Sequence, residues 1–361
     1  MNIESVAKLF GINGPLEEDE HITIGHINVT HHVKIGGSDY IIQKINKFVF
    51  KNPVALMDNI VKVTGFIKNK LEKSNSKTDR YVLSFIKAPS GNYYVIDDDG
   101  EYYRMYHYVG NAITYNVIDS LEIMERTGIA FGNFQCQLSD FDASLLSETI
   151  PNFHNTINRY KNLENAKEKD EFNRFESVKD IYNEFMSIKN TAIKMTEMYN
   201  NKELPLRVTH NDTKCNNVLF DIDTNEPLAV IDLDTVMPGL TGFDFGDSIR
   251  IGAANSKEDE TDESKIFMNL DKFEAFAKGF LSKTKTSLTE KEIETLPLGA
   301  ITMTTECGVR FLTDYLEGDV YFHKSYENHN LDRAKSQLLL AQDMIKKYDE
   351  MKAIIKKIVE N

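Results

Sequence analysis

The sequence has little cysteine, no long hydrophobic run and fewer basic than acidic residues. Its three cysteines, Cys136, Cys215 and Cys307, are odd in number and far apart, which argues against a disulfide framework or a zinc site. No apolar run reaches the roughly 18 residues of a membrane span. The first residues also lack the basic and apolar regions of a signal peptide. We therefore expect a cytoplasmic protein with no membrane partner.

The shortage of basic charge also bears on partners. The 42 Lys and Arg residues against 56 Asp and Glu residues give a formal charge of −14. A nucleic-acid partner is disfavoured, because phosphates require basic patches. An acidic surface can attract a cationic substrate such as an aminoglycoside or choline, or it can simply aid solubility. With 361 residues, 41% of them hydrophobic, the chain is long enough for two lobes.

The segment with the strongest functional signal is His210-x-Asp212-x4-Asn217. This spacing is typical of a kinase catalytic loop, in which the aspartate accepts the proton of the substrate hydroxyl and the asparagine holds magnesium. The loop predicts Asp212 as the catalytic base and Asn217 as a metal ligand. A catalytically silent nucleotide-binding pseudokinase remains an alternative.

A second metal ligand is predicted from a hairpin. Residues 218–222 and 228–231 are typical of strands, and a turn-rich cluster separates them. Folding about residues 224 and 225 would place Asn217 opposite Asp232. Opposed residues have Cβ atoms roughly 4.5–5.5 Å apart, close enough to share an ion. Two oxygen-donor side chains together with phosphate oxygens suit magnesium.

The sequence also contains Asp244-Phe245-Gly246, which matches the metal-binding motif of protein kinases. Asp244, however, lies 27 residues after Asn217, whereas Asp232 lies 15 residues after it. The hairpin gives Asp244 no partner at the metal. We therefore interpret Asp244 and Asp247 as structural carboxylates that brace the catalytic loop.

The rest of the chain predicts an α+β fold with two lobes. Strands are expected within residues 22–46, 81–87, 93–96 and 102–109, with a helix from Asn52 to about Glu72. After Gly110 the spacing is helical, and Thr289 with Glu292 forms a capping box. We predict a nucleotide-binding lobe over residues 1–108 and a larger, mainly helical catalytic and substrate-binding lobe over residues 109–361.

Five residues of the first lobe are candidates for binding the nucleotide. His26 and Asn28 lie where a kinase has its phosphate-covering loop, although this loop has a single glycine. Lys44 lies on the third expected strand, where kinases carry a lysine for the α- and β-phosphates. Tyr106 and Tyr108 lie in the expected hinge. A plain turn, a solvated lysine and an ordinary edge strand are the competing interpretations.

Several segments resemble one family, the bacterial N-acetylhexosamine 1-kinases, which belong to the aminoglycoside-phosphotransferase-like, kinase-fold superfamily. The resemblance covers nearly the whole chain. The catalytic loop marks only the superfamily, whereas residues 310–322 narrow it to sugar kinases. The matching segments are residues 25–28, 131–135, 140–142, 208–217, 230–239, 243–250, 307–322 and 329–331.

The resemblance implies a bilobal protein-kinase-like fold and phosphorylation of the anomeric hydroxyl of N-acetylglucosamine or N-acetylgalactosamine. ATP would be the phosphoryl donor, Mg²⁺ the cofactor and the sugar 1-phosphate the product. Arg310 and Tyr321 would contact the sugar. An aminoglycoside or choline kinase is the alternative, but a buried arginine disfavours a cationic substrate. Lysine is not consistently present at the Lys44 position of these relatives, so how the α- and β-phosphates are held stays open.

Overall fold

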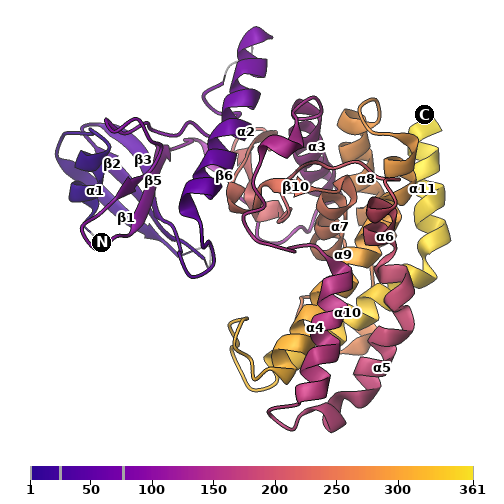
Figure 1. Ribbon diagram of the computed structural model, residues 1–361. Helices are drawn as coiled ribbons and strands as arrows, with labels where there is room; N and C mark the ends of the chain where they lie inside the picture. The colour runs from indigo at the N-terminus through magenta and orange to yellow at the C-terminus, as the bar shows by residue number, and fades with distance from the viewer. Residues whose placement is uncertain (1, 24–26, 75–77, 361) are drawn as a thin grey trace. The chain divides into compact units, whose positions relative to one another are not determined.

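The computed structural model describes residues 2–23, 27–74 and 78–360 (Figure 1). The chain forms two compact units. Unit 1 comprises Met1–Thr114, Asp140–Pro151 and Val218–Pro238, and unit 2 comprises Tyr115–Ser139, Asn152–Asn217 and Gly239–Asn361. Unit 1 is rich in strands and unit 2 in helices, which confirms the predicted α+β class. Among the described residues, no helix is both long and apolar enough to cross a membrane.

Unit 1 is built on a five-stranded antiparallel sheet with the order β1-β2-β3-β5-β4. Its strands are β1 (Leu16–Ile22), β2 (Val29–Ile35), β3 (Ser38–Lys44), β4 (Val95–Ile96) and β5 (Tyr102–His107). Gly36 and Gly37 join β2 to β3 with φ angles of 58° and 78°, the left-handed values that tight hairpins require. The strand expected over residues 81–87 is wrong, since only an isolated bridge joins Phe85 to Tyr106 there.

The two faces of this sheet have different environments. On one face, Ile42 and Tyr103 belong to a buried apolar cluster together with residues of α1 (Ile3–Leu9). Lys44 pairs with Tyr103 in the register between β3 and β5, and Gln43 pairs with Arg104. Because successive residues of a strand point to opposite faces, Lys44 lies on the α1 face and Gln43 on the other.

Helix α2 (Pro53–Lys73) begins as predicted, with the Asn52 side chain accepting from the backbone N–H of Ala55. Its buried Asn59 side chain donates to the carbonyls of Ser147 (2.8 Å) and Val236 (3.0 Å). It also accepts from the Ser147 N–H (2.9 Å). This one side chain therefore joins α2 to two later stretches of unit 1, the first of which follows the 3₁₀ helix η1 (Ala143–Leu145).

A second sheet in unit 1 contains the predicted hairpin. Its strands are β6 (Ala112–Ile113), β8 (Val218–Asp221) and β9 (Pro227–Val230), in the order β6-β8-β9. The expected register is wrong by one residue at Val218, which pairs with Val230, and by two residues at Phe220, which pairs with Pro227, because the ladder is irregular between them. Asp232 lies beyond the strand in the left-handed region (φ 56°) and leads into the 3₁₀ helix η3 (Leu233–Thr235).

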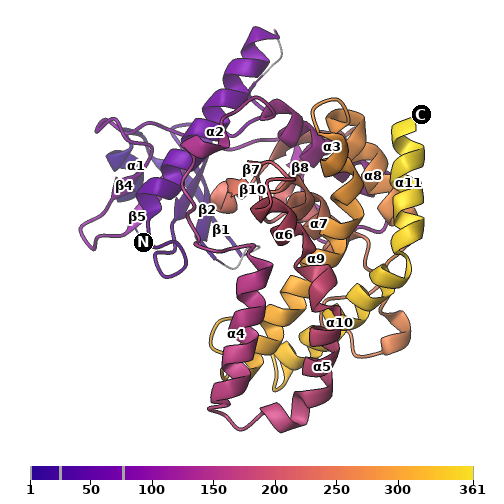
Figure 2. The same cartoon turned by 45° about the vertical axis from the view of Figure 1, so that its right-hand side comes forward.

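Unit 2 is mainly helical (Figure 2). Its helices are α3 (Leu121–Gln137), α4 (Thr156–Lys169), α5 (Phe175–Ala192), α6 (Lys194–Asn200), α7 (Thr241–Gly252), α8 (Leu270–Thr284), α9 (Glu290–Leu316), α10 (His329–Lys346) and α11 (Tyr348–Glu360). Its short elements are β7 (Arg207–Thr209), η2 (Cys215–Asn217) and η4 (Glu263–Lys265), whereas β10 (Met237–Gly239) begins in unit 1 and ends at the first residue of the last segment of unit 2. Helix α9 begins with the predicted capping box between Thr289 and Glu292.

Helix α9 is the centre of unit 2. Its C-terminal half shares a buried apolar cluster with α4, α5 and α10, which gather around it in Figure 2. Its N-terminal half packs closely on α7, where a Cβ at Gly246 would lie 2.2 Å from the carbonyl oxygen of Gly299. The glycine of Asp244-Phe245-Gly246 therefore permits a close approach of two helices. The same approach fixes α7, which carries Asp244 and Asp247.

Candidate active site

The catalytic loop follows β7 and brings Asp212 and Asn217 together. The side-chain amide of Asn217 donates to the carbonyl oxygen of Asp212 (2.8 Å) and to its carboxylate (3.3 Å). Asn211 is in the left-handed region (φ 63°), a conformation that asparagine tolerates better than most residues. The ammonium group of Lys214 lies 2.8 Å from Asp212 Oδ1. The predicted base and one predicted metal ligand are therefore neighbours in unit 2.

Asp244 and Asp247 brace this loop, as predicted. Asp244 is fully buried and its two carboxylate oxygens accept from the backbone N–H groups of His210 (2.9 Å) and Asn211 (2.8 Å). Thr213 donates its hydroxyl to the Asp244 carbonyl (2.6 Å) and its N–H to Asp247 (3.1 Å). Asp244 is thus committed to holding the loop backbone.

The two aspartates differ in their ionisation. Burial disfavours the charge on Asp212, but the charge and hydrogen bond of Lys214 outweigh it and hold the pKa of Asp212 below its usual range. Burial is also the largest influence on Asp244, and there it raises the pKa despite the hydrogen bonds that the carboxylate accepts. Asp212 is therefore a carboxylate at neutral pH, as a residue that orients a hydroxyl and accepts its proton must be.

In unit 1, Asp234 joins three parts of the chain close to Asp232. Its carboxylate pairs with the Nη1 group of Arg104 on β5 and accepts from the side-chain amide of Asn28 (2.5 Å). Asn28 in turn accepts from the backbone N–H of Asn46 (3.0 Å). The predicted nucleotide residue Asn28 is therefore fixed to the segment that carries the predicted metal ligand.

Arg104 is only 2% exposed and donates through Nε to Gln43 (2.8 Å). Burial opposes its charge, but Asp234 and, more weakly, Asp232 favour it, so the pKa of Arg104 lies above its usual value. The pKa of Tyr106 is also raised, in this case mainly by burial, and the charges of Asp232 and Asp234 contribute to the increase. Tyr106, Asp232 and Asn28 thus belong to one neighbourhood of unit 1, with Arg104 among them.

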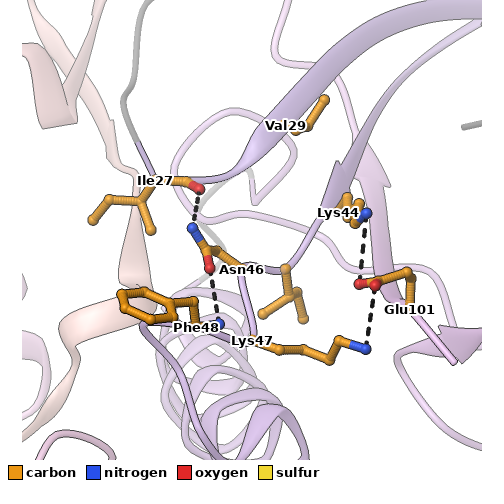
Figure 3. Close-up of a pocket in the computed structure, with 8 residues that line it drawn as sticks. Ile27, Val29, Lys44, Asn46, Lys47, Phe48 and Glu101 are labelled. Carbon is orange, nitrogen blue, oxygen red and sulfur yellow. Dashed lines mark hydrogen bonds and ion pairs between the residues drawn. The ribbon is translucent and has the colours of Figure 1, made fainter.

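Lys44 lies on the opposite face of the sheet from Arg104. Its ammonium group points to Glu101 (3.6 Å), which also takes Lys47 (3.2 Å), as Figure 3 shows. These three residues line a pocket of about 320 Å³ together with Ile27, Val29, Ile45, Asn46 and Phe48. The contacts of Lys44 therefore differ from those that join Asn28 and Arg104 to Asp234.

The two remaining nucleotide candidates are Tyr108 and His26. Tyr108 is 39% exposed and stacks on His32 with ring centroids 4.0 Å apart. Its backbone N–H donates to the carbonyl of Asp39 (3.1 Å), so this hinge donor is already engaged. His26 lies outside the described residues.

The predicted metal ligands offer the correct kind of donor for Mg²⁺. Asn217 and Asp232 both present oxygen, and Mg²⁺ is usually held by one or two protein groups together with phosphate oxygens. Across residues 2–23, 27–74 and 78–360, no group of three or more His, Cys, Asp or Glu side chains is placed to hold a metal ion. A dedicated zinc or calcium cage is therefore not found in the described part of the chain.

Arg310 and Tyr321 lie together in unit 2. The Arg310 guanidinium lies over three rings, those of Phe153 (5.6 Å), Tyr321 (5.9 Å) and Phe322 (5.2 Å). No carboxylate among the described residues forms an ion pair with Arg310. The guanidinium is therefore held by aromatic faces and keeps its N–H groups for another partner.

A second arginine adds to this positive charge. Burial, and then the nearby charge of Arg310, lower the pKa of Arg159. Its Nη2 donates to the Phe153 carbonyl (2.6 Å), but its buried Nε has no partner among the described residues. The nearby carboxylate of Glu306 is occupied by His154 (2.9 Å) and by another side chain. The two guanidiniums thus form a positive cluster with spare donors.

This cluster is linked to the catalytic loop. His154 bridges Glu306 and the carbonyl oxygen of Asn211 (3.3 Å), the residue before Asp212. The loop that carries Tyr321 is held by Asp314, whose carboxylate accepts the backbone N–H groups of Tyr321 (2.7 Å) and its two neighbours. Tyr321 is 60% exposed, so the loop presents its ring to solvent.

A profile of the phosphotransferase enzyme family matches residues 82–266, about half of the chain. The chain belongs to this family. The matched segment contains Asp212, Asn217, Asp232 and the bracing Asp244. The phosphotransferase family therefore accounts for the catalytic loop and its hairpin, whereas Arg310 and Tyr321 lie beyond the matched segment.

Solved structures with the same fold include three phosphotransferases. A microcompartment-associated aminopropanol kinase is 12% identical, with a TM-score of 0.57 and 97% of each chain covered. An aminoglycoside phosphotransferase from Alicyclobacillus acidocaldarius is 10% identical, with a TM-score of 0.60, covering 99% of this chain and 96% of the other. A spectinomycin phosphotransferase in complex with ADP and spectinomycin is 13% identical, with a TM-score of 0.51, covering 99% and 97%. These similarities confirm the predicted protein-kinase-like fold.

The sequence of this phosphotransferase did not predict the pairing of Asp234 with Arg104. It also gave no role to Arg104, His154, Arg159 and Glu306. Arg104 carries one usable signal, because a charged residue inside the aromatic strand Tyr102–His107 is rarely buried without a partner. The sequence contains no such signal for the other three residues, because their roles depend on contacts between α4, α9 and the loop before α4.

Proposed function

We propose that this phosphotransferase transfers the γ-phosphoryl group of ATP, with Mg²⁺, to the anomeric hydroxyl of an N-acetylhexosamine. The product would be the sugar 1-phosphate. The observation that carries the choice of acceptor is the cluster of Arg310 and Arg159, which has spare donors and no ion pair from Arg310 to a carboxylate among the described residues. The sequence resemblance to N-acetylhexosamine 1-kinases points to the same acceptor.

The charge of this cluster separates classes of acceptor. Choline and aminoglycosides are cations, and two like charges in a partly buried site would cost them binding energy. A neutral sugar presents hydroxyl and amide oxygens that accept hydrogen bonds from guanidinium groups. The exposed Tyr321 ring offers an apolar face and one polar tip, which suits a sugar ring.

The catalytic residues would act mainly by positioning. Asp212 would hold the anomeric hydroxyl and accept its proton, in the ionised state that Lys214 favours. Asn217 and Asp232 would hold Mg²⁺, which neutralises charge on the phosphates when it is bound. Asp244 and Asp247 would keep the loop backbone in place, because they accept its N–H groups.

Nucleotide binding is assigned to residues 1–108 as part of this proposal, and substrate binding and catalysis to residues 109–361. Asn28 and Tyr106 would line the nucleotide site, since both lie in the neighbourhood of Asp232 and Asp234. The related spectinomycin phosphotransferase holds ADP with the same fold, which is consistent with ATP as the donor. Nucleotide contacts by His26, Lys44 and Tyr108 stay predictions.

The test is ADP release with ATP and Mg²⁺ across a panel of N-acetylglucosamine, N-acetylgalactosamine, glucose, galactose, choline and kanamycin. We expect turnover that is confined to the two N-acetylhexosamines. Turnover with choline or kanamycin alone would contradict the sugar assignment while leaving Asp212 as the base. Absence of turnover with all six, with ATP still bound, would favour a pseudokinase.

A further inference from the structure

Strands β3 and β5 carry two cationic side chains, Lys44 and Arg104, on opposite faces of the sheet. In protein kinases a lysine on the third strand contacts the α- and β-phosphates and pairs with a carboxylate. Here the third strand ends in Lys44, whose register partner is Tyr103 on the face that α1 covers. Lys44 is paired with Glu101 (Figure 3). The residue of the third strand that points to the other face, where Arg104 binds Asp234, is Gln43, and it carries no charge.

The positive charge on that face comes from the neighbouring strand. Arg104 on β5 lies opposite Gln43 and donates to it (2.8 Å). Gln43 is fixed by its own bond to Thr30 on β2 (2.9 Å). The other end of the guanidinium pairs with Asp234. A cation paired with a carboxylate, beside the predicted metal ligand Asp232, repeats the lysine–glutamate arrangement of kinases with different residues.

We propose that Arg104 binds the β-phosphate of the nucleotide and takes the role expected of Lys44. Arg104 uses Nε and Nη1 in the contacts above, and its Nη2 donates to no described residue. A guanidinium has a planar fork of five donors, so it can keep one carboxylate and still bind phosphate oxygens. Asn28, the residue directly before β2, is bound to the same Asp234 carboxylate, which places its side chain close to this cation. This inference rests on the proposed ATP-dependent function.

The test compares nucleotide affinity in the presence of Mg²⁺ by calorimetry, with adenosine, ADP and a non-hydrolysable ATP analogue. In the wild-type protein, ADP should bind more tightly than adenosine because of its phosphates. Arg104→Gln should reduce the ratio of ADP to adenosine affinity about 10- to 100-fold, the usual worth of a hydrogen bond to a charged group. Adenosine affinity should stay unchanged, which also shows that the variant is folded.

Lys44→Gln is the matched comparison, because it removes one positive charge from the adjacent strand and the opposite face. It should keep the wild-type ratio. If Arg104→Gln no longer binds adenosine, Arg104→Lys is measured instead. We expect its ratio of ADP to adenosine affinity to be lower than in the wild type but still measurable, because lysine keeps the positive charge and lacks the planar set of guanidinium donors. A wild-type ratio in both Arg104 variants, or loss of the ratio in Lys44→Gln alone, would overturn the assignment.

The outcomes also separate this inference from the proposed function. A phosphate-dependent affinity that needs Arg104, without turnover of any sugar, would support the inference and contradict the proposed acceptor. Sugar turnover with an Arg104→Gln ratio equal to the wild type would support the function and overturn the inference. A wild-type protein that binds ADP no better than adenosine would contradict both.

Discussion

Arg104 in unit 1 and Arg310 in unit 2 place the same charged group in two different settings. Arg104 is 2% exposed. Two of its nitrogens are engaged by polar groups: Nη1 pairs with the Asp234 carboxylate, and Nε donates to the side-chain oxygen of Gln43. Arg310 is held by three aromatic rings and has no ion pair to a carboxylate within the described residues. The first arginine is fixed in direction, and the second is fixed in place with its donors free.

This difference matches the two ligands in the proposed reaction. A polyphosphate is charged and must be aligned for in-line transfer, so a cation with a fixed direction is suited to it. A neutral sugar presents several oxygens, so a guanidinium on aromatic faces can serve more than one of them. The partner of an arginine, rather than its charge alone, therefore indicates the class of ligand.

The largest effect is expected from removing the proposed catalytic base, because both arginines would position ligands for the step that this base promotes. Asp212→Asn should lower kcat by about 10²- to 10⁴-fold, because the variant cannot accept the proton of the acceptor hydroxyl. ADP and sugar affinities should change little, since neither arginine is altered. Stopped-assay turnover and calorimetry measure the two properties. A wild-type rate in this variant would remove Asp212 as the base.

The next comparison is between the two aspartates that compete for the metal assignment. Asp232→Asn should weaken Mg²⁺-dependent ATP binding at least about tenfold, as expected when the environment of a metal site is disrupted. Asp244→Asn should instead lower the free energy of unfolding by about 1–3 kcal/mol, because it disturbs a buried acceptor of backbone N–H groups. Calorimetry and urea unfolding distinguish them. If Asp244→Asn were the variant that lost Mg²⁺-dependent binding, the two assignments would have to be exchanged.

A smaller effect is expected at the acceptor. Arg310→Gln should raise the KM for N-acetylglucosamine by about 10- to 100-fold, the range for a lost charge-assisted hydrogen bond. The KM for ATP should change less than about twofold, because Arg104 is untouched. Arg333→Gln is the matched control, since Arg333 also lies over a ring, that of Phe311, but donates to the His323 carbonyl. Equal effects of the two variants would refute a specific sugar contact.

The smallest effect concerns Glu306, the buried carboxylate near Arg159 that is bonded to His154 and Thr156. Burial opposes its charge, but the bond and charge of His154 outweigh burial, so the pKa of Glu306 lies below its usual range. A lowered pKa adds stability above the ordinary value of about 4.3, which is lost as the pH falls below it. Glu306→Gln should therefore be less stable than the wild type by about 1 kcal/mol at pH 7. The difference should shrink toward pH 3 in urea unfolding. A difference independent of pH would contradict this ionisation.

The sequence predicted two contacts between neighbouring residues and one contact between residues far apart in the chain. The Asn52 cap of α2, the Thr289 capping box of α9 and the bracing role of Asp244 are confirmed by their hydrogen bonds. Each capping prediction rests on side chains within a few residues of a helix start. The role of Asp244 followed from its distance along the chain to Asn217.

Predictions from the sequence were wrong or missing where the structure depends on irregular strand pairing or on contacts between residues far apart in the chain. The hairpin register is wrong by one to two residues because the ladder between β8 and β9 is irregular, which spacing alone does not reveal. Residues 81–87 have strand-like composition but contribute only a bridge to β5. Arg104 and Asp234 are 130 positions apart in sequence, so their pairing depends on the fold.

The most direct test of the central claim is the position of the phosphate in the product. The wild-type protein would be incubated with ATP, Mg²⁺ and N-acetylglucosamine, and the purified product examined by phosphorus–proton correlation NMR. We expect the phosphorus to couple to the anomeric proton, which identifies the 1-phosphate. Coupling to the protons at carbon 6 would contradict the placement of the anomeric hydroxyl against Asp212.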